Sequence, residues 1–346
     1  MATSILYPEN AQLQVIEQKF IQATTTDAAT DPIWNHAIIE PINAAKVMWD
    51  QLDNYAGRTQ HRGIGGEPAR VNPVGVSRYE YRPYYMGEFL ALGEQQLTES
   101  AEMGTWATTL DWRGLSLEKQ RQLLTRRVVS WRSILWNLLT YGQYNVFDPR
   151  TGQMVAADGY TPRTYAAAFT WSNAGSSTPL ADLRNLKYMQ RGFSTRFDRT
   201  STLYVNQKTA NNALLNTNTA DLYGRRVEGL ATVNTLDDFN KLLTKDDLPN
   251  IQVHDEVWND DTNGNAATLY IPDNTGIVIG RRTTGVPLIK FFLTRNMMNL
   301  DFSPGAYSHI IDTRMFGKRP GEIQVHDGYN GGPANYFPSS CVVMSL

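Results

Sequence analysis

The clearest hydrophobic pattern in the chain runs from Ser116 to Gly142, a segment without proline. Its apolar residues recur at steps of three and four, the spacing of one helix face. They are Leu117, Leu124, Val128, Trp131, Leu135 and Leu138. Ser116 suits the N-cap, Glu118 would lie in the first turn, and Gly142 can adopt the left-handed turn that ends a helix. The pattern predicts one helix of roughly 40 Å, long enough to connect two packing units.

The charged residues of this segment fall mostly off the apolar stripe. They include Lys119, Arg126, Arg127 and Arg132. We therefore expect them to point away from the core that the stripe covers.

Shorter elements are predicted on both sides of the long helix. Helical spacing indicates helices over residues 9–22 (with Leu13, Ile16 and Phe20), 42–52 after Pro41, 179–189, 209–216 and 236–245. Short apolar or alternating runs indicate strands over residues 144–147, 153–157, 203–205, 251–258, on either side of 272–276, and 341–344. A helix followed at once by a hairpin indicates an α+β fold. The middle third has enough elements for a second domain inserted into the first.

Two stretches have a different composition. Residues 23–31 are polar and rich in threonine, with too little apolar material to pack alone, which is typical of an arm. Residues 55–85 are rich in glycine and proline and contain alternating residues, which predicts an extended β-hairpin. This hairpin carries five arginines against two acids: Arg58, Arg62, Arg70, Arg78 and Arg82 against Glu67 and Glu80. The excess of three positive charges favours contact with a polyanion or an acidic neighbour.

The overall charge narrows the function classes. The chain has 32 basic and 34 acidic side chains, so a protein that coats itself with nucleic acid or binds membranes through basic residues is excluded. Arginine outnumbers lysine 23 to 9, which favours ion pairs at interfaces. Cys341 is the lone cysteine, and no apolar run reaches the roughly 18 residues of a membrane span. We expect a soluble protein of a reducing compartment, without internal disulfides or a signal peptide.

Three sequence blocks resemble the C-terminal half of the lambda-type major capsid proteins, the capsid E family of tailed bacteriophages. They are LPNIQVHDEVW at 248–258, LYIPDNTGIVIG at 269–280 and PANYFPSSCVVMSL at 333–346. The order of elements from residue 117 onward is also similar to that family. The resemblance implies an α+β, Hong Kong 97-type capsid fold. It would place an N-terminal arm at 1–54, an extended loop at 55–85, a peripheral domain at 86–159 and 285–346 with a spine helix at 116–141, and an axial domain at 160–284.

The resemblance also implies a function. The chain would self-assemble as hexamers and pentamers into an icosahedral virion shell around packaged double-stranded DNA, in the cytoplasm of a host. Its partners would be other copies, a separate scaffolding protein, a portal and, as a further candidate, a decoration protein. A shell subunit needs several unlike contact surfaces, and extended loops supply them without a larger core. The expected inter-subunit contacts are Arg58, Arg62, Arg70, Arg78, Arg82, Tyr79, Tyr81, Arg126 and Arg127, and the expected spine core is Leu124, Val128, Trp131, Leu135 and Leu138.

Other chemistry has weaker support in the sequence. The words Ile-Gln-Val-His-Asp occur at 251–255 and 323–327 and suggest a metal site with Asp260 and Asp261, but neighbours in a strand point to opposite faces. Residues 261–272 lack the glycine and glutamate of a calcium loop, and Ser339, Ser340 and Cys341 lack the glycines of a nucleophile elbow. We therefore predict no catalytic, cofactor or metal site and no enzyme activity. A cargo-enclosing nanocompartment of the same fold, and more distantly a metal-dependent or carbohydrate-active hydrolase, remain the alternatives.

Overall fold

The computed structural model describes most of the chain. The described residues are 10–26, 31–52, 76–81, 83–93, 112–147, 154–193, 195–218, 235–260, 266–280, 287–299, 302–312 and 322–346. The chain divides into two compact units: unit 1 is residues 1–48, 80–132 and 289–334, and unit 2 is residues 49–79, 133–288 and 335–346. The division falls within the longest helix, so each unit contains part of it.

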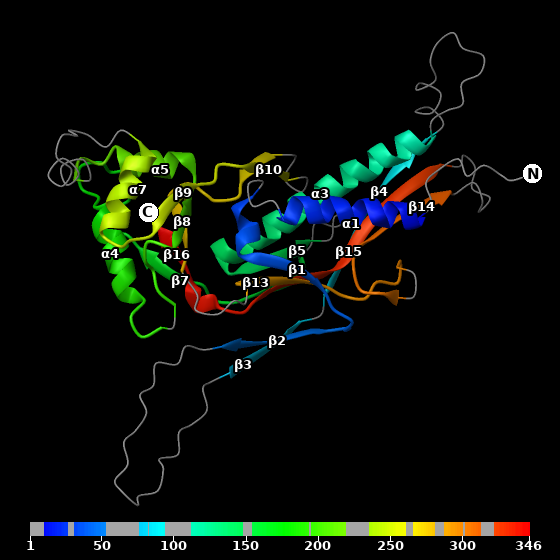
Figure 1. Ribbon diagram of the computed structural model, residues 1–346, viewed down its shortest axis with the longest axis horizontal. Coiled ribbons are helices and arrows are strands. Elements are labelled where there is room, and N and C mark those ends of the chain that lie inside the picture. Colours follow the sequence, from blue (N-terminus) through cyan, green and yellow to red (C-terminus); the bar gives the residue numbers. More distant parts are fainter. Residues whose placement is uncertain are drawn as a thin grey trace, which may run out of the picture. The chain divides into compact units, whose positions relative to one another are not determined.

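Unit 1 is built on a five-stranded sheet (Figure 1). The strands are β1 (Ala37–Pro41), β4 (Tyr84–Leu92), β13 (Ile289–Leu293), β14 (Tyr307–Asp312) and β15 (Ile323–Asn335). Their order is β1-β13-β15-β14, with β4 also paired to β15. β1 runs parallel to β13, whereas β4 and β14 are antiparallel to β15. β15 is the long central strand to which segments from both ends of the chain attach.

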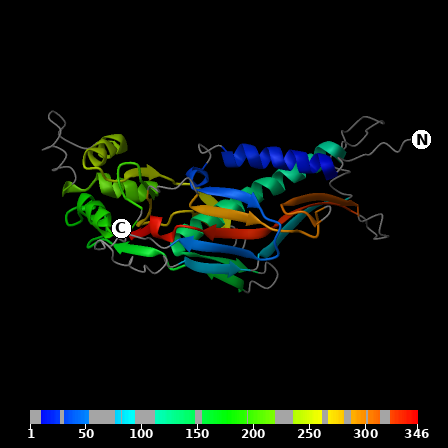
Figure 2. The same cartoon turned by 60° about the horizontal axis from the view of Figure 1, so that its bottom comes forward.

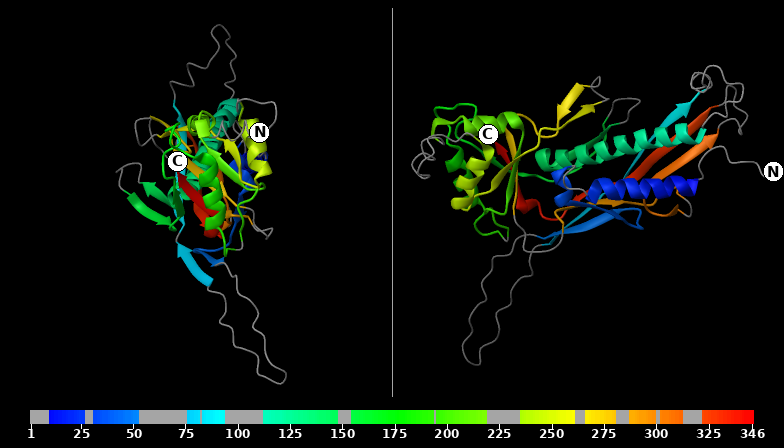
Figure 3. Two further views of the ribbon diagram at one scale, coloured as in Figure 1. Left: turned by 90° about the vertical axis from the view of Figure 1, so that its left-hand side faces the viewer. Right: turned by 45° about the horizontal axis from the view of Figure 1, so that its top comes forward.

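Two helices cover one face of this sheet. α1 (Asn10–Thr26) lies beside the first part of α3 (Trp112–Tyr141), and both lie over the same side of the strands (Figures 2 and 3). Gln120 of α3 joins the three layers, because its Nε2 donates to the Leu13 carbonyl of α1 at 2.9 Å and lies 3.3 Å from Ser308 Oγ of β14. The short helix η1 (Pro32–Asn35) follows α1 and is capped by Asp31, whose carboxylate accepts from Ile33 N at 2.9 Å.

Unit 2 contains a second five-stranded sheet with three helices (Figure 1). The strand order is β7-β16-β12-β8-β9. The strands are β7 (Arg163–Ala166), β8 (Thr202–Val205), β9 (Asn250–Val253), β12 (Thr275–Ile279) and β16 (Cys341–Ser345), and the helices are α4 (Pro179–Met189), α5 (Gln207–Leu214) and α7 (Leu236–Lys245). Asn206 caps α5 by accepting from Thr209 N, and Thr235 caps α7 by accepting from Asp238 N. Polar cap residues therefore fix where these short helices begin.

The core of unit 2 lies between the helices and one sheet face. Leu203, Val205, Val278, Val342 and Met344 from the strands are buried against apolar residues of the three helices. On the other face, Tyr204 contacts Trp136 from the last turns of α3, with ring centroids 5.5 Å apart. Further short elements of the unit are two strand pairs, β5 (Gln143–Phe147) with β6 (Met154–Gly159) and β10 (Val257–Asp260) with β11 (Ala266–Leu269), and the short helix η5 (Pro338–Ser340).

The long helix confirms the strongest sequence pattern but begins earlier than predicted. It starts at Trp112, so Ser116 is a buried interior residue rather than the N-cap, and Glu118 lies beyond the first turn. Gly142 follows the last helical residue with a φ of 72°, as predicted. The expected spine residues Leu124, Val128, Trp131, Leu135 and Leu138 are all buried.

Several shorter elements match the sequence pattern. The helices at 179–189 and 236–245 have the predicted bounds, and the helix predicted at 209–216 lies two residues earlier, at Gln207–Leu214. The predicted hairpin after the long helix is the antiparallel pair β5–β6, although its turn at 148–153 lies outside the described residues.

The first helix forms, but with a different inner face. α1 extends to Thr26, and it buries Leu13 and Glu17 while Ile16 is exposed. Asp31, predicted to belong to a loosely packed arm, is fully buried.

The helix predicted over residues 42–52 is wrong, because residues Val47–Leu52 form strand β2. This strand pairs with β3 (Val76–Tyr81) in a two-stranded sheet. The predicted hairpin at 55–85 is likewise revised, since Tyr84 and Tyr85 belong to β4 in the sheet of unit 1, and residues 53–75 lie outside the described part of the chain. The apolar run at 47–52 fits both periods, and pairing with β3 selects the strand.

Two strand predictions in the last third also change. The strand predicted at 251–258 is two strands, β9 and β10, separated at His254–Glu256 and paired with different partners. The strands on either side of 272–276 do not pair with each other: β11 pairs with β10, and β12 lies between β8 and β16. The terminal strand β16 does pair within a sheet, as predicted, but that sheet belongs to unit 2, whereas the expected boundaries grouped 285–346 with the spine helix.

Candidate functional site

The arginines of α3 occupy three different environments within unit 1. Arg126 is exposed and forms a two-pronged ion pair with Glu88 of β4, from Nε to Oε2 at 2.7 Å and from Nη2 to Oε1 at 3.0 Å. It therefore lies on the surface, as expected of a contact residue. An exposed pair of this kind contributes little to stability by itself.

Arg127 was predicted as an inter-subunit contact, but it is buried inside the subunit. Its side chain lies between Glu17 of α1, at 2.8 Å from Nη1 to Oε1, and Asp327 of β15, at 3.4 Å from Nε to Oδ2. All three residues are about 4% exposed. We call this group the Glu17–Arg127–Asp327 cluster. A guanidinium enclosed by two carboxylates has no surface left for another subunit, which corrects the prediction.

Burial dominates the electrostatics of this cluster. It raises the pKa of Asp327 to about 7, even though Arg127 acts in the opposite direction. It also raises the pKa of Glu17 above its usual value, again against the pull of Arg127. Removing a carboxylate from water favours its neutral form, and one guanidinium does not offset that cost for two acids.

Arg132 is a second buried arginine that the pattern placed away from the core. Its Nε contacts the carboxylate of Asp31, which also caps η1. The pair links the spine helix to the segment that follows α1. The burial of Arg127 and of Arg132 has the same cause: each is paired with an acid from a segment before residue 32.

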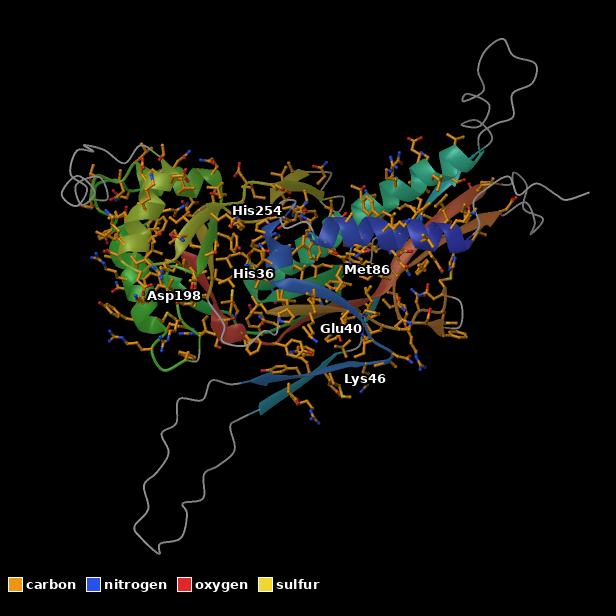
Figure 4. The ribbon with its side chains drawn as sticks, viewed as in Figure 1. His36, Glu40, Lys46, Met86, Asp198 and His254 are labelled. Carbon is orange, nitrogen blue, oxygen red and sulfur yellow. The ribbon has the colours of Figure 1, made fainter. Side chains whose placement is uncertain are left out.

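The β2–β3 pair carries two further predicted contact residues that the structure describes, Arg78 and Tyr79. Arg78 is exposed and its Nε lies 3.0 Å from Asp50 Oδ1 on the other strand. Tyr79 stacks on Trp49 with ring centroids 5.7 Å apart, and Trp49 Nε1 donates to the Asn335 carbonyl at 3.1 Å. Lys46 and Glu80 form a further exposed pair (Figure 4). Arg58, Arg62, Arg70, Arg82 and the side chain of Tyr81 lie outside the described residues.

A surface that the sequence analysis missed lies on the helix-free face of the sheet in unit 1. Residues alternate along β4, so Met86 and Glu88 face α3 while Tyr85 and Phe89 point the other way. Tyr85 is 80% exposed and Phe89 53% exposed, and Phe89 stacks on His326 of β15 at 5.1 Å. We call Tyr85, Phe89 and His326 the aromatic sheet face. The sequence did contain a signal for this face: Tyr85, Gly87 and Phe89 are spaced two residues apart, which places them on the same face of a strand.

Glycines keep this face flat beside β14. Gly87 of β4 and Gly328 of β15 are paired, and the hydroxyl of Tyr307 lies over both of them. A Cβ added at Gly87 would lie 2.5 Å from Tyr307 Oη, and one at Gly328 would lie 2.6 Å from the same atom. Only glycine leaves room for the Tyr307 ring at these positions.

In the two copies of Ile-Gln-Val-His-Asp, the histidine and the aspartate have different contacts. His254, at the end of β9 (Figure 4), stacks on Trp136 and Tyr270, while Asp255 accepts from Gln207 N. The other copy places Asp327 in the buried cluster and His326 on the aromatic sheet face. Within the described ranges, no group of three or more His, Cys, Asp or Glu side chains is placed to hold an ion. Asp261 lies outside those ranges.

The thiol of Cys341 is in an environment that disfavours its reactive thiolate form. The thiol is buried in β16, and burial raises its pKa to about 12. At neutral pH the thiol is protonated, and the thiolate is the reactive form. The neighbouring Ser340 donates its hydroxyl to the Phe337 carbonyl at 2.8 Å. These groups therefore serve packing. Separately, none of the helices among the described residues is long and apolar enough to cross a membrane.

Comparisons with known proteins identify the fold. No protein-family model and no curated protein matches the sequence. The structure is similar to the putative capsid protein of a prophage of E. coli CFT073, with a TM-score of 0.55 and 11% identity over 95% of this chain and 98% of that chain. It is also similar to a phage-related protein from Bordetella bronchiseptica RB50, with a TM-score of 0.53 and 8% identity over 97% and 96% of the two chains. The chain therefore has the predicted α+β, Hong Kong 97-type capsid fold.

Proposed function

We propose that the chain is a major capsid protein that self-assembles as hexamers and pentamers into the icosahedral shell of a bacteriophage around its double-stranded DNA. The observation that carries this proposal is the likeness to a prophage capsid protein along nearly the whole length of both chains.

The surfaces of the described residues support a subunit that contacts copies of itself. Tyr85 and Phe89 are large, exposed and on the same sheet face of β4, and aromatic side chains are enriched at the centres of protein interfaces. We propose that the aromatic sheet face contacts a neighbouring subunit.

The finer assignments are also proposals. The three sequence blocks at 248–258, 269–280 and 333–346 support a lambda-type, capsid E family member. In that reading the expected partners are a separate scaffolding protein, a portal and a decoration protein, and the expected location is the virion after assembly in the host cytoplasm. The near balance of 32 basic and 34 acidic side chains suits a wall that encloses DNA without gripping it. No enzyme activity, cofactor or metal is expected.

Particle mass tests the proposal. The purified chain, alone and with its scaffolding protein, should form closed shells of megadalton mass in mass photometry and negative-stain microscopy. A chain that stays at about 39 kDa under both conditions would contradict it.

A matched pair of variants tests the aromatic sheet face. Phe89→Glu should leave the melting temperature of the subunit within a few degrees of the parent but abolish closed shells, because an interface buries the new charge. Phe169→Glu, at an equally exposed aromatic residue of unit 2, is the control and should assemble normally. Normal shells from Phe89→Glu would remove this face from the interface.

A further inference from the structure

The Glu17–Arg127–Asp327 cluster buries two carboxylates with one guanidinium, so its charges do not balance. Glu17 belongs to α1, Arg127 to α3 and Asp327 to β15, so the cluster joins three elements of unit 1. Among the described residues, Arg127 is the one cation paired with either carboxylate. If both acids are ionised, the cluster carries a net charge of −1 without solvent to screen it. One added proton makes it neutral.

Among the described residues, His309 is the one neighbour besides Arg127 that favours the ionised form of Glu17, and it forms no ion pair with either carboxylate. On β14, Ser308 faces Asp327, Tyr307 is half-buried, and His309 lies near Glu17 with its Nε2 on the Met298 carbonyl. On β4, Glu88 adds negative charge and is itself paired with Arg126 of α3. On β15, His326 points to the opposite face and stacks on Phe89. Within the described part of the chain, no second cation is ion-paired with the two carboxylates, so one bound proton makes the cluster neutral.

The distribution of buried and exposed residues on α1 indicates that the cluster contributes strongly to the packing of this helix against α3 and the sheet. The inner side of α1 buries Leu13 and the charged Glu17, while Val15 and Ile16 are exposed. A further polar link is the hydrogen bond from Gln120 Nε2 to the Leu13 carbonyl. The apolar part of the inner side is narrow, with Leu13 buried and Phe20 and Ile21 half-buried, so the buried carboxylate of Glu17 is a large part of the attachment.

We propose that the cluster is a proton-controlled latch for α1: a proton shared between Glu17 and Asp327 keeps α1 docked on α3 and the sheet, and loss of that proton loosens the docking. When α1 leaves, Glu17 enters water as a carboxylate, and Arg127 and Asp327 remain as a balanced pair. The proton goes to solvent, so undocking releases one proton. This inference concerns the single subunit and does not depend on the proposed shell function.

The direction of the pH effect follows from proton linkage. The docked state holds its proton up to about pH 7, whereas a free carboxylate loses it near pH 4. Between these values the docked state binds more protons than the undocked state, so rising pH disfavours docking. The undocking equilibrium constant should increase by up to about tenfold per pH unit across this window and then level off above about pH 7 to 8. Docking is thus tightest on the acid side.

Hydrogen exchange measured by mass spectrometry tests the latch in the full chain. Amides of residues 10–26 are followed between about pH 5 and 8.5, and each rate is divided by the intrinsic rate of the unfolded peptide at that pH. Protection of α1 should fall by roughly tenfold per unit up to about pH 7 and then stay constant. Peptides from α4, residues 179–189, serve as the internal reference and should show no such trend.

Charge-removing variants assign the effect to the cluster. Glu17→Gln and Asp327→Asn each leave one acid facing Arg127, so α1 should stay protected at pH 8 and its protection should no longer depend on pH. Glu118→Gln, at an exposed acid of α3, should behave like the parent chain. Two results would overturn the proposal: a parent chain whose α1 protection is independent of pH, or cluster variants that keep the parent's slope. The parent titration decides by itself if a variant fails to fold.

Discussion

At the scale of single residues, Trp131 is the point where three elements of unit 1 meet. Its ring lies 5.8 Å from Phe291 of β13 and 5.5 Å from Tyr329 of β15, and the Arg127 guanidinium lies 5.4 Å from its centroid. Edge-to-face aromatic contacts of this kind add to the stability gained from burial alone. Trp131 is therefore one of the side chains that attach the spine helix to the sheet, beside Arg127 and its ion pair with Asp327.

Trp131→Ala should lower the free energy of unfolding by about 3 to 5 kcal/mol, because it removes a fully buried ring and leaves a cavity. Chemical denaturation of the purified subunit measures the change. Tyr141→Ala on the same helix is the matched control, since Tyr141 is exposed and its loss should shift stability by no more than about 0.5 kcal/mol. Equal losses of unfolding free energy in the two variants would show that the Trp131 ring does not stabilise the packing of the spine helix on the sheet.

The buried arginines of α3 could not be assigned from the sequence. Arg132 lies beside the predicted apolar stripe, and Arg127, three residues after Leu124 and four before Trp131, lies at its edge. A charged side chain at the border of an apolar stripe usually reaches solvent. Each is buried because an acid from α1 or from the segment after it, Glu17 or Asp31, reaches it in the fold. Helical periodicity gives the direction of a side chain but not which charged partner will lie there.

At the scale of elements, the end of α3 is set by a residue that must be glycine. Gly142 has a φ of 72°, and its amide donates to the Leu138 carbonyl at 3.0 Å. A Cβ there would lie 2.2 Å from the Tyr160 carbonyl oxygen and 2.4 Å from Pro162 Cδ. The left-handed turn and the close approach of 160–162 both exclude a side chain.

Gly142→Ala should destabilise the subunit by at least about 1 to 3 kcal/mol, since the substitution combines backbone strain with a steric clash. Thermal unfolding followed by circular dichroism should show a clearly lower midpoint. The control is Gly175→Ala, where an added Cβ meets nothing within 4 Å. An unchanged midpoint for Gly142→Ala would mean that the chain relieves both constraints cheaply.

Element type followed local pattern where the pattern was long or bounded by caps. The helices at 179–189 and 236–245 formed with the predicted bounds, and the long helix formed with its predicted glycine end but a start at Trp112, because helical periodicity is sustained in all three. Residues 47–52 did not form the predicted helix, because their apolar residues fit a helix and a strand equally well. The strand with which they pair, β3, comes more than 20 residues later in the sequence. Partner strands, rather than propensity, decided that element.

At the scale of the whole molecule, the proposed shell requires residues of one subunit that contact another copy of the chain. The arginine-rich segment with Arg58, Arg62 and Arg70 is the candidate, because it carries more positive charge than its few acids balance. Arginine is suited to two-pronged pairing with carboxylates at interfaces. We expect these side chains to contact acidic groups of a neighbouring subunit.

Replacing Arg58, Arg62 and Arg70 together by glutamine should leave the subunit folded but reduce the yield of closed shells at least tenfold. Circular dichroism checks the fold, and mass photometry counts the particles. Arg121→Gln, at an exposed arginine of α3, is the control and should assemble like the parent chain. Shells formed at the parent yield by the triple variant would place the contact elsewhere.

The sequence by itself determined the features that depend on neighbours along the chain: the spine helix and its glycine end, the hairpin after it, the short helices of unit 2, and a resemblance sufficient to predict the capsid fold. Only the tertiary structure decided which segments approach each other. That choice buried Arg127 between Glu17 and Asp327, made 47–52 a strand, placed β12 beside β8 and β16, and exposed Tyr85 and Phe89 on one face. Local periodicity fixes an element because its hydrogen bonds are local, whereas burial of a charge or an aromatic ring depends on contacts between residues up to hundreds of positions apart.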